Sequence, residues 1–291
     1  MKEKHNALRS LIASMVIFGT VGIFRRWIPL SSAAVAAARG LVGAALLLAL
    51  QAVRKQKLSA ACIRQNLALL LCSGAAMGVN WIALFEAYRY TTVAAATLCY
   101  YMAPILVILL SPLVLREKLT ARKCLCACAA LLGMVFVSGV LDSGGLGGLS
   151  GALLGLLAAA LYASVVLMNK RMRPMPSTDR VSVQLLTAGI VLLPYALLTG
   201  GVGQASPGAR TLALLAVVCV VHTGLAYALY FSSMEHLPAH TLAILSYIDP
   251  VVAVLLSALL LHEPLTLPTV LGAVLILGAA IVCELPEKEK T

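Results

Sequence analysis

Long apolar stretches alternate with short polar connections along the whole chain. A helix needs about 20 apolar residues to cross the roughly 30 Å hydrocarbon core of a bilayer, and these stretches have that length. The pattern predicts ten transmembrane helices. Their expected ranges are 8–27, 33–52, 66–86, 91–115, 121–140, 148–169, 180–199, 211–232, 238–261 and 267–284.

Composition excludes a soluble globular protein. Of the 291 residues, 61% are hydrophobic and only 11% are charged, and the mean hydropathy is +0.98. The sequence therefore predicts an all-α membrane protein with no soluble domain. A net charge of +11 would suggest nucleic acid as the partner of a soluble protein. No nucleic-acid partner is expected here, because the positive charge follows the topology.

The basic residues collect on one side of the expected membrane. With the N-terminus in the cytoplasm, seventeen of the 22 lysines and arginines lie inside and four lie outside, while Arg39 lies within the second helix. The four outside are Arg25, Arg26, Arg89 and Arg210. This bias predicts two cytoplasmic termini, an even number of helices and a bacterial inner membrane as the location. Nine further apolar stretches favour a retained first helix over a cleaved secretory signal.

The second half of the chain repeats the first with an offset of about 145 residues. Tyr101 falls on Tyr247, and Pro104 falls on Pro250. Thirteen residues beyond each proline comes Glu117-Lys118-Leu119-Thr120 or Glu263-Pro264-Leu265-Thr266. The repeat predicts two units, 1–145 and 146–291. Because each holds five helices, an odd number, the second unit enters the membrane inverted, as in many secondary transporters.

These residues carry a family resemblance over nearly the whole chain. The Pro104 helix followed by Arg-Glu-Lys-Leu-Thr, the Pro250 helix followed by His-Glu-Pro-Leu-Thr, and the Phe85-Glu-Ala-Tyr-Arg-Tyr segment resemble the EamA family of the drug/metabolite transporter superfamily. The resemblance implies ten helices in two EamA repeats and cytoplasmic termini. It also implies export of amino acids or related metabolites, often coupled to protons. Some relatives import instead, or carry nucleotide sugars or sugar phosphates, so the fold does not fix the cargo.

Ionisable groups inside a bilayer are costly and usually face a cavity, so they are the first candidates for function. Asp249 lies near the middle of its expected helix, and His222 lies at a similar depth in the preceding one. A carboxyl group and an imidazole at this depth could exchange protons. In the alternative interpretation, Asp249 braces the backbone freed by Pro250 and His222 is a satisfied core residue. Both interpretations stay open from the sequence.

Three further polar residues are candidates for binding a solute. A buried Arg39 could hold a carboxylate by a two-pronged hydrogen bond, although pairing with Glu86 or reaching toward water is favoured slightly. Glu86, at the outer end of the third helix, is expected at the rim or in an ion pair. Asn80 could offer its amide to a substrate, but a bridge between two helices is equally consistent with the sequence.

Aromatic residues and prolines complete the candidate set. Rings suit amphipathic or cationic cargo, and those that could line a path are Trp81, Tyr88, Tyr100, Tyr101, Tyr162, Tyr227, Tyr230 and Tyr247. Tyr101 and Tyr247 are favoured by the repeat, whereas Tyr88 lies near a predicted interface where aromatic belts are normal. Pro104 and Pro250 are expected to kink their helices and to take part in gating. Glu117 and Glu263 are expected to cap helices.

The leading hypothesis is a secondary transporter for a zwitterion such as an amino acid. The alternative within transport is an importer or exchanger of an organic cation. No phosphate-binding loop, Gly-x-Ser-x-Gly or His-Glu-x-x-His pattern occurs in the sequence. An intramembrane enzyme and a non-transporting scaffold are therefore the weaker alternatives. We expect no cofactor and no metal site, with the eight cysteines serving as small apolar residues. The expected partners are the solute, protons and lipid, and the expected state is a monomer or homodimer.

Overall fold

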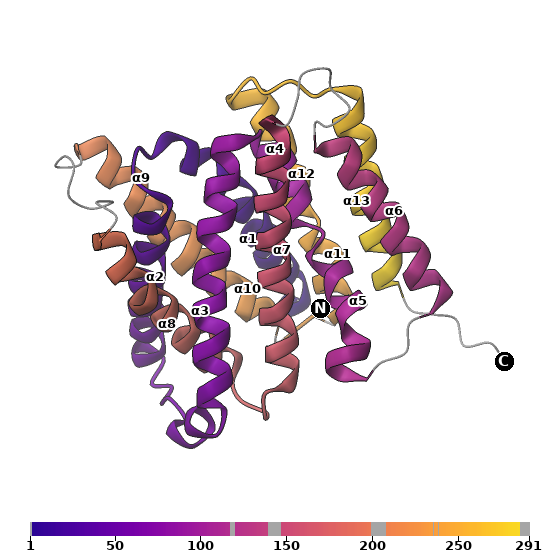
Figure 1. The fold of residues 1–291 in the computed structure, drawn as a ribbon. Helices are drawn as coiled ribbons and strands as arrows, with labels where there is room; N and C mark the ends of the chain where they lie inside the picture. Colours follow the sequence, from indigo (N-terminus) through magenta and orange to yellow (C-terminus); the bar gives the residue numbers. More distant parts are fainter. Residues whose placement is uncertain are drawn as a thin grey trace.

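The computed structural model describes residues 2–116, 120–138, 147–198, 208–234, 236–237 and 239–285. Those residues form a bundle of helices and contain no β-strand (Figure 1). Helices of the N-terminal half are α1 (Lys2–Trp27), α2 (Ser32–Val53), α3 (Ala60–Tyr90), α4 (Val93–Tyr100), α5 (Ala103–Leu115) and α6 (Ala121–Val137). Those of the C-terminal half are α7 (Gly147–Arg171), α8 (Ser177–Leu198), α9 (Ala209–Cys219), α10 (Ala226–Met234), α11 (Ala239–Ser246), α12 (Ile248–Leu260) and α13 (Leu267–Glu284).

Hydroxyl side chains fix where many of the helices begin. The first backbone N–H groups of a helix have no partner within it, and a serine or threonine just before the helix can accept from one of them. Ser31 accepts from the amide of Ala34, and Thr92 accepts from that of Ala95. The same arrangement occurs at the starts of α3, α6 and α13, where the capping residues are Ser59, Thr120 and Thr266.

Seven helical segments are long and apolar enough to cross a membrane, and two shorter apolar segments, Ile244–Leu260 and Leu267–Cys283, follow them among the described residues. Every expected range contains helix. Three expected helices are not continuous, however. The range 91–115 is divided into α4 and α5, and the range 238–261 into α11 and α12. The range 211–232 contains a π-helical segment, η1 (Val220–Leu225), between α9 and α10.

The strongest helix packing joins the two halves of the chain. Helix α2 packs along α8, α3 packs along α7 and α8, and α6 packs along α13. Helix α1 packs against α10 and α12, while α7 packs against α4 and α5 (Figure 1). The N-terminal and C-terminal halves are therefore interleaved, and neither surrounds a separate core.

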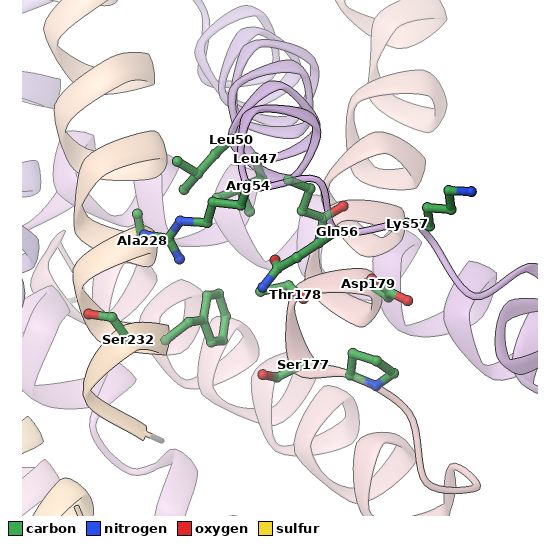
Figure 2. Close-up of a pocket in the computed structure, with 13 residues that line it drawn as sticks. Leu47, Leu50, Arg54, Gln56, Lys57, Ser177, Thr178, Asp179, Ala228 and Ser232 are labelled. Carbon is green, nitrogen blue, oxygen red and sulfur yellow. The ribbon is translucent and has the colours of Figure 1, made fainter. Parts of the chain in front are cut away.

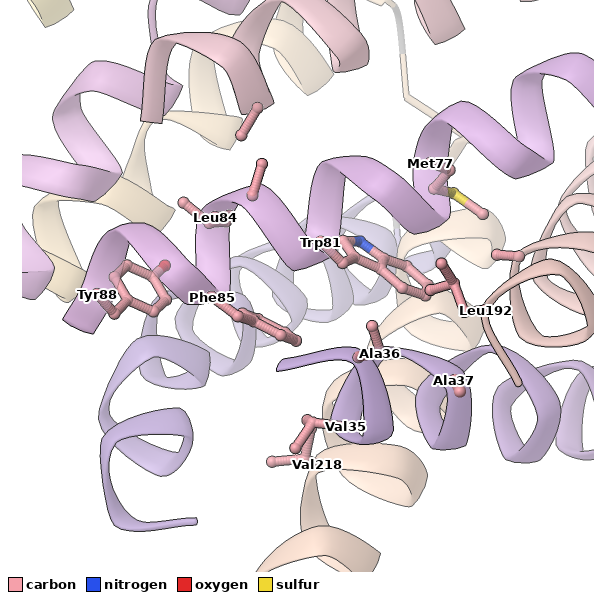
Figure 3. Packing of buried hydrophobic residues seen from close by; sticks show 14 of the residues in the cluster. Val35, Ala36, Ala37, Met77, Trp81, Leu84, Phe85, Tyr88, Leu192 and Val218 are labelled. Atoms are coloured by element: carbon pink, nitrogen blue, oxygen red, sulfur yellow. The ribbon is translucent and has the colours of Figure 1, made fainter. Parts of the chain in front are cut away.

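A buried apolar cluster holds the centre of this arrangement. It includes residues of α2, α3, α8 and α9, and Figure 3 shows Trp81 and Phe85 pointing from α3 toward Ala36 and Ala37 of α2. Large apolar side chains also cover much of the outer surface, such as Leu113 and Leu198. An outer surface of this kind suits lipid tails, which are as apolar as the side chains themselves.

Two glycines bring the backbones of α2 and α8 together. A Cβ atom on Gly40 would lie 2.5 Å from the amide nitrogen of Gly189, and a Cβ atom on Gly189 would lie 2.7 Å from the amide nitrogen of Leu41. Backbone atoms cannot move aside as a flexible side chain can. The crossing therefore requires glycine at both positions, which is the small-residue packing expected between membrane helices.

We expect Gly40→Ala to lower the stability of the purified protein by about 1–3 kcal/mol, because the added methyl group must separate two packed backbones. Gly278→Ala in α13 is the matched control, since its Cβ atom would meet nothing within 4 Å. Alanine there should raise stability slightly through helix propensity, by up to about 1 kcal/mol. The measurement is the unfolding midpoint in detergent. Equal midpoints for the two variants would contradict the close crossing.

Candidate functional site

A cavity of about 600 Å³ lies inside the bundle, which is within the usual range for small-molecule sites. Seven of the nine tyrosines line it. The aromatic residues on its wall are Phe18, Trp81, Phe85, Tyr88, Tyr100, Tyr101, Tyr162, Tyr227, Tyr230 and Tyr247. Its charged residues are Arg39, Lys123, Lys170 and Asp249. We call this space the central cavity.

The two broken helices place their ends on the central cavity. Helix α4 ends at Tyr100 and α5 begins at Ala103, so Tyr101 lies at the break. Pro104 falls in the first turn of α5, where its missing N–H is not needed. In the C-terminal half, Tyr247 lies between α11 and α12. Pro104 and Pro250 thus lie in the first turns of half-helices, just after the interruptions, where the sequence predicts kinks.

Asp249 is held at this break from the opposite half. The hydroxyl of Tyr101 donates a hydrogen bond of 2.7 Å to its carboxylate, and the rings of Tyr101 and Tyr247 lie 6.1 Å apart. Helix α1 approaches closely here, because a Cβ atom on Gly19 would lie 2.7 Å from the carbonyl oxygen of Asp249. The carboxylate therefore lies where α1, the α4–α5 break and α12 meet.

The π-helical segment turns two consecutive polar side chains into the protein. The imidazole of His222 lies 2.7 Å from the hydroxyl of Thr20 on α1, and Thr223 accepts a hydrogen bond of 3.1 Å from Arg39 on α2. The Thr223 hydroxyl also donates to the carbonyl oxygen of Val218, five residues earlier. The wider turn frees carbonyl groups that such side chains can satisfy, and π-helical turns occur frequently at functional sites.

Arg39 lies on the wall of the central cavity and is 5% exposed. Its guanidinium carbon is 4.4 Å from the centre of the Trp81 ring and 5.5 Å from that of Phe85. Rings of this kind attract a cation through their negative faces. No carboxylate of a described residue lies within ion-pair distance of it. Arg39 is thus positioned by rings and a hydroxyl, and its charge is not cancelled by a neighbouring acid.

Other expected candidates lie outside the central cavity. Glu86 is an ion-pair residue, as expected, but its partner at 3.0 Å is Arg89 and not Arg39, so one of the two alternatives for Arg39 is wrong. The amide of Asn80 donates to the carbonyl oxygen of Ala158, so this buried residue bridges α3 and α7. His222 is buried against the ring of Phe24 and does not line the cavity. No hydrogen bond joins His222 to Asp249 among the described residues.

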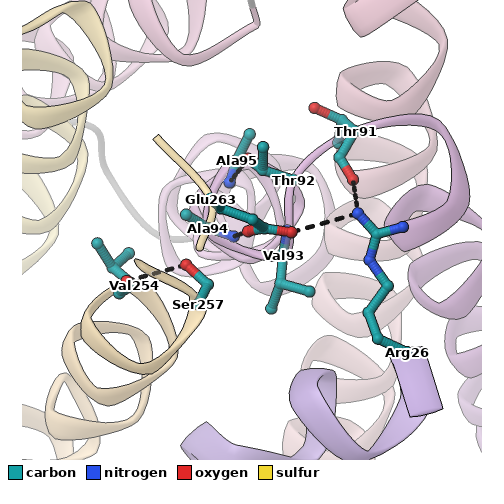
Figure 4. A network of polar contacts seen from close by, with 9 residues as sticks. All are labelled: Arg26, Thr91, Thr92, Val93, Ala94, Ala95, Val254, Ser257 and Glu263. Carbon is teal, nitrogen blue, oxygen red and sulfur yellow. Dashed lines mark hydrogen bonds and ion pairs between the residues drawn. The ribbon is translucent and has the colours of Figure 1, made fainter. Parts of the chain in front are cut away.

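A polar network joins the two halves of the chain at one end of the bundle (Figure 4). Glu263, in the connection after α12, accepts hydrogen bonds of 2.8 and 3.4 Å from the amides of Val93 and Ala94 at the start of α4. It also forms an ion pair of 3.2 Å with Arg26. Glu263 caps a helix of the other half, as expected from the sequence. Its counterpart in the repeat, Glu117, lies outside the described residues.

The central cavity extends toward the opposite end of the bundle. Lys123 at the start of α6 and Lys170 at the end of α7 are part of its wall. Arg171, the residue after Lys170, donates a hydrogen bond to the carbonyl oxygen of Val114 at the end of α5. The cavity therefore runs from buried aromatic groups to basic residues at helix ends, whereas the Glu263 network joins the two halves at the other end.

Comparisons with known proteins agree with this architecture. A model of the EamA-like transporter family matches the chain twice, over residues 7–139 and 149–284. The chain belongs to the EamA-like transporter family. The two matches confirm the resemblance drawn from the Pro104 and Pro250 segments, and they make the protein a multi-pass membrane transporter of small solutes.

Several relatives are similar over most of their length. The chain is 30% identical to an uncharacterized transporter, YxxF, of Bacillus subtilis (strain 168) over 281 residues, which cover 94% of this chain and 88% of that protein. It is 28% identical to protein PecM of Dickeya dadantii (strain 3937), covering 72% of this chain and 70% of PecM. A crystal structure of a protein at 18% identity covers 95% of this chain and 96% of that chain with a TM-score of 0.66. It supports the fold alone.

Tyr88, a candidate for the transport path that also lay near a predicted interface, is buried and lines the cavity. Sequence reasoning missed several other residues around this EamA-like site. Thr20 and Thr223 were not singled out, because a threonine in an apolar stretch gives no signal of its partner. Lys123 and Lys170 contributed only to the topology, since their charge alone does not indicate a cavity wall.

We expect Glu263→Gln to lower the stability of the purified EamA-like protein by about 1–3 kcal/mol, because the amide loses the ion pair and turns a donor toward backbone N–H groups. Glu86→Gln is the matched control. Its carboxylate forms an exposed ion pair with Arg89 three residues later, and such a pair should contribute less than about 1 kcal/mol. Unfolding midpoints in detergent measure both. A loss for Glu86→Gln as large as that for Glu263→Gln would contradict the capping role.

Proposed function

We propose that this protein is a secondary transporter that exports amino acids or related zwitterions across the bacterial inner membrane in exchange for protons. The supporting observation is that Arg39 and Asp249, of opposite charge, line one cavity among aromatic rings. An α-amino acid carries a carboxylate and an ammonium group on one carbon atom. Arg39 matches the first and Asp249 the second, while the rings match the apolar part of the solute.

The rival function is the import or exchange of an organic cation. Aromatic walls and one carboxylate suit a cation well, so Asp249 and the tyrosines fit either solute. Arg39 favours the zwitterion, because a cation that enters would meet an uncancelled positive charge in a site of low dielectric constant. An experiment can therefore separate the two hypotheses by comparing solutes that have a free carboxylate with solutes that lack one.

Exchange of solute for protons would rest on competition between a proton and the substrate ammonium group for the carboxylate of Asp249. A substrate ammonium group binds Asp249 only while the carboxylate is charged, and a proton that binds there removes that charge. Proton and substrate would then occupy the carboxylate in turn and move in opposite directions. A proton gradient directed into the cell drives the solute outward under this scheme. His222, hydrogen-bonded to Thr20, does not contact the carboxylate and has no role in this scheme.

The unequal ends of the central cavity support alternating access. We place the Glu263 network on the outer side and Lys123 and Lys170 on the cytoplasmic side, in agreement with the excess of basic residues expected inside. The described structure then represents a state that faces the cytoplasm. Ten crossings in two inverted five-helix repeats, 1–145 and 146–291, provide the second state by exchanging the roles of the two ends.

We expect Asp249→Asn to abolish proton coupling in liposomes, because an amide neither releases a proton nor carries the charge that holds an ammonium group. Amino acids and organic cations are screened for flux under an imposed pH gradient while internal pH is recorded. Initial flux should fall about tenfold or more and stop responding to the gradient. Glu86→Gln is the matched control, since it removes an acidic group outside the cavity. Unimpaired coupling in folded Asp249→Asn, or solute flux without protons in wild type, would overturn the mechanism.

We expect Arg39→Met to remove the preference for a free carboxylate. Wild type should carry an amino acid at least about tenfold faster than its amide or methyl ester, because only the free carboxylate forms the charged hydrogen bonds. In Arg39→Met this ratio should approach one. Flux of the ester and the amide equal to that of the amino acid in wild type would instead support the organic-cation function.

A further inference from the structure

His222 is a buried ionisable side chain that the proposed proton exchange does not use. It is 1% exposed and belongs to the π-helical segment η1. Its imidazole nitrogen Nε2 lies 2.7 Å from the hydroxyl of Thr20 on α1. Neutral histidine has one tautomer that donates from Nε2 and one that accepts there, and a hydroxyl can complement either. The hydrogen bond to α1 therefore needs no charge on His222.

Segment η1 is held between α1 and α2. On the α1 side, the ring of His222 lies 4.9 Å from that of Phe24. On the α2 side, a Cβ atom on Gly43 would lie 2.5 Å from the methyl carbon of Thr223. The methyl group of Thr223 thus lies directly on the backbone of α2, one helical turn after Arg39.

This packing leaves the hydroxyl of Thr223 as an acceptor for Arg39. The hydroxyl hydrogen is donated to the carbonyl oxygen of Val218 at 3.1 Å, and the oxygen accepts from Nε of Arg39 at 3.1 Å. Neither Nη1 nor Nη2 of Arg39 donates a hydrogen bond to a described residue, and Arg39 lines the central cavity. These two nitrogens form the fork that can bind a carboxylate by two parallel hydrogen bonds.

The rings beside Arg39 do not fix the direction of this fork. Trp81 and Phe85, at 4.4 and 5.5 Å, attract the cation through their faces and leave the guanidinium free to turn over them. A hydrogen bond is directional, because it weakens steeply as its angle departs from linear. The bond to Thr223 therefore decides where the fork points.

The backbone of α2 is fixed independently of η1. The glycine crossing with α8 holds it beside Arg39, and the amide of Gln51 donates to Ser182 of α8 at 3.5 Å. Beyond Gln51, the end of α2 borders a second cavity of about 430 Å³, where Figure 2 shows Arg54 extending toward Ala228 of α10. That cavity shares no wall residue with the central cavity. The direction of the Arg39 side chain thus depends on η1 and not on the end of α2.

We propose that His222 and Thr223 are positioning residues that direct Arg39 toward the carboxylate of the solute. His222 attaches the π-helical turn to α1, the extra residue of that turn brings Thr223 to α2, and Thr223 orients the guanidinium. A regular α-helical turn in its place would rotate Thr223 by about 100°. The inference rests on the proposed transport of zwitterions, because the free carboxylate is the group that the fork recognises.

Substrate preference in liposomes tests the positioning. His222→Leu and Thr223→Val each remove one hydrogen bond of the series, and each should lower the ratio of amino acid flux to methyl ester flux about fivefold. His222→Gln and Thr223→Ser keep the hydrogen-bonding groups and should retain the wild-type ratio. A loss of stability alone would lower both fluxes together and leave the ratio unchanged. An unchanged ratio in His222→Leu and Thr223→Val, or an equal loss in the conservative variants, would overturn the proposal.

The response to a pH gradient distinguishes positioning from proton transfer. Glutamine can donate and accept a hydrogen bond but does not titrate. Flux through His222→Gln should therefore respond to an imposed pH gradient as wild type does. Loss of that response in folded His222→Gln would show that His222 carries the proton, which contradicts a positioning role.

Fluorescence tests the placement of Arg39 without any transport. Trp27 and Trp81 are the two tryptophans of the chain, so Trp27→Phe leaves Trp81, which the guanidinium contacts, as the single source of emission. In this background, His222→Leu and Thr223→Val should change the emission in the same direction as Arg39→Met, whereas His222→Gln should leave it unchanged. Equal wild-type flux of an amino acid and its ester would contradict the proposed function. Unchanged emission in any of the first three variants would contradict the positioning of Arg39.

Discussion

A bilayer offers no water to backbone N–H and C=O groups, so a helix inside it can be interrupted only where protein groups or a cavity satisfy the freed positions. This constraint explains where the interruptions of the present chain lie. The α4–α5 break and the α11–α12 break both open onto the central cavity, and they bring Tyr101 and Tyr247 to its wall. The Thr223 hydroxyl of the π-helical turn donates to the carbonyl oxygen of Val218 in the preceding turn and accepts a hydrogen bond from Arg39. The interrupted helices and the candidate site residues therefore lie together on the wall of the central cavity.

The central cavity separates its charges instead of pairing them. Arg39 rests on Trp81 and Phe85, and Asp249 accepts from Tyr101, so each charge is held by a group that leaves it uncancelled. An internal ion pair would lower the cost of burying both groups, but it would also remove the attraction for a solute. Neutral partners fix the two side chains in place at a higher cost of burial. A zwitterion bound between them would supply an opposite charge to each. Electrostatic attraction of this kind is strongest in a site of low dielectric constant.

Hydropathy predicted the helices well because lipid imposes one requirement along every crossing segment. The internal repeat paired Tyr101 with Tyr247 but did not predict that both helices break there, and the rarity of charge in apolar stretches singled out Arg39 and Asp249. The neighbours of these residues could not be predicted. Hydropathy does not indicate which helices touch, so Asn80 and Glu86 were open candidates until Ala158 and Arg89 proved to be their partners. The π-helical turn depends on one extra residue in a turn, which leaves the apolar pattern of residues 211–232 unchanged.

Interleaving limits how such a protein can change state. Rocking one sequence half against the other would separate α1 from α12 and α7 from α4, contacts that build the wall of the central cavity itself. The half-helices offer a less costly route, because each of α4, α5, α11 and α12 can tilt at a break that already lacks continuous helical hydrogen bonds. Glu263 is connected to this route directly. It lies just beyond α12 and accepts from the first amides of α4, so a tilt of α4 relative to α12 would break these hydrogen bonds.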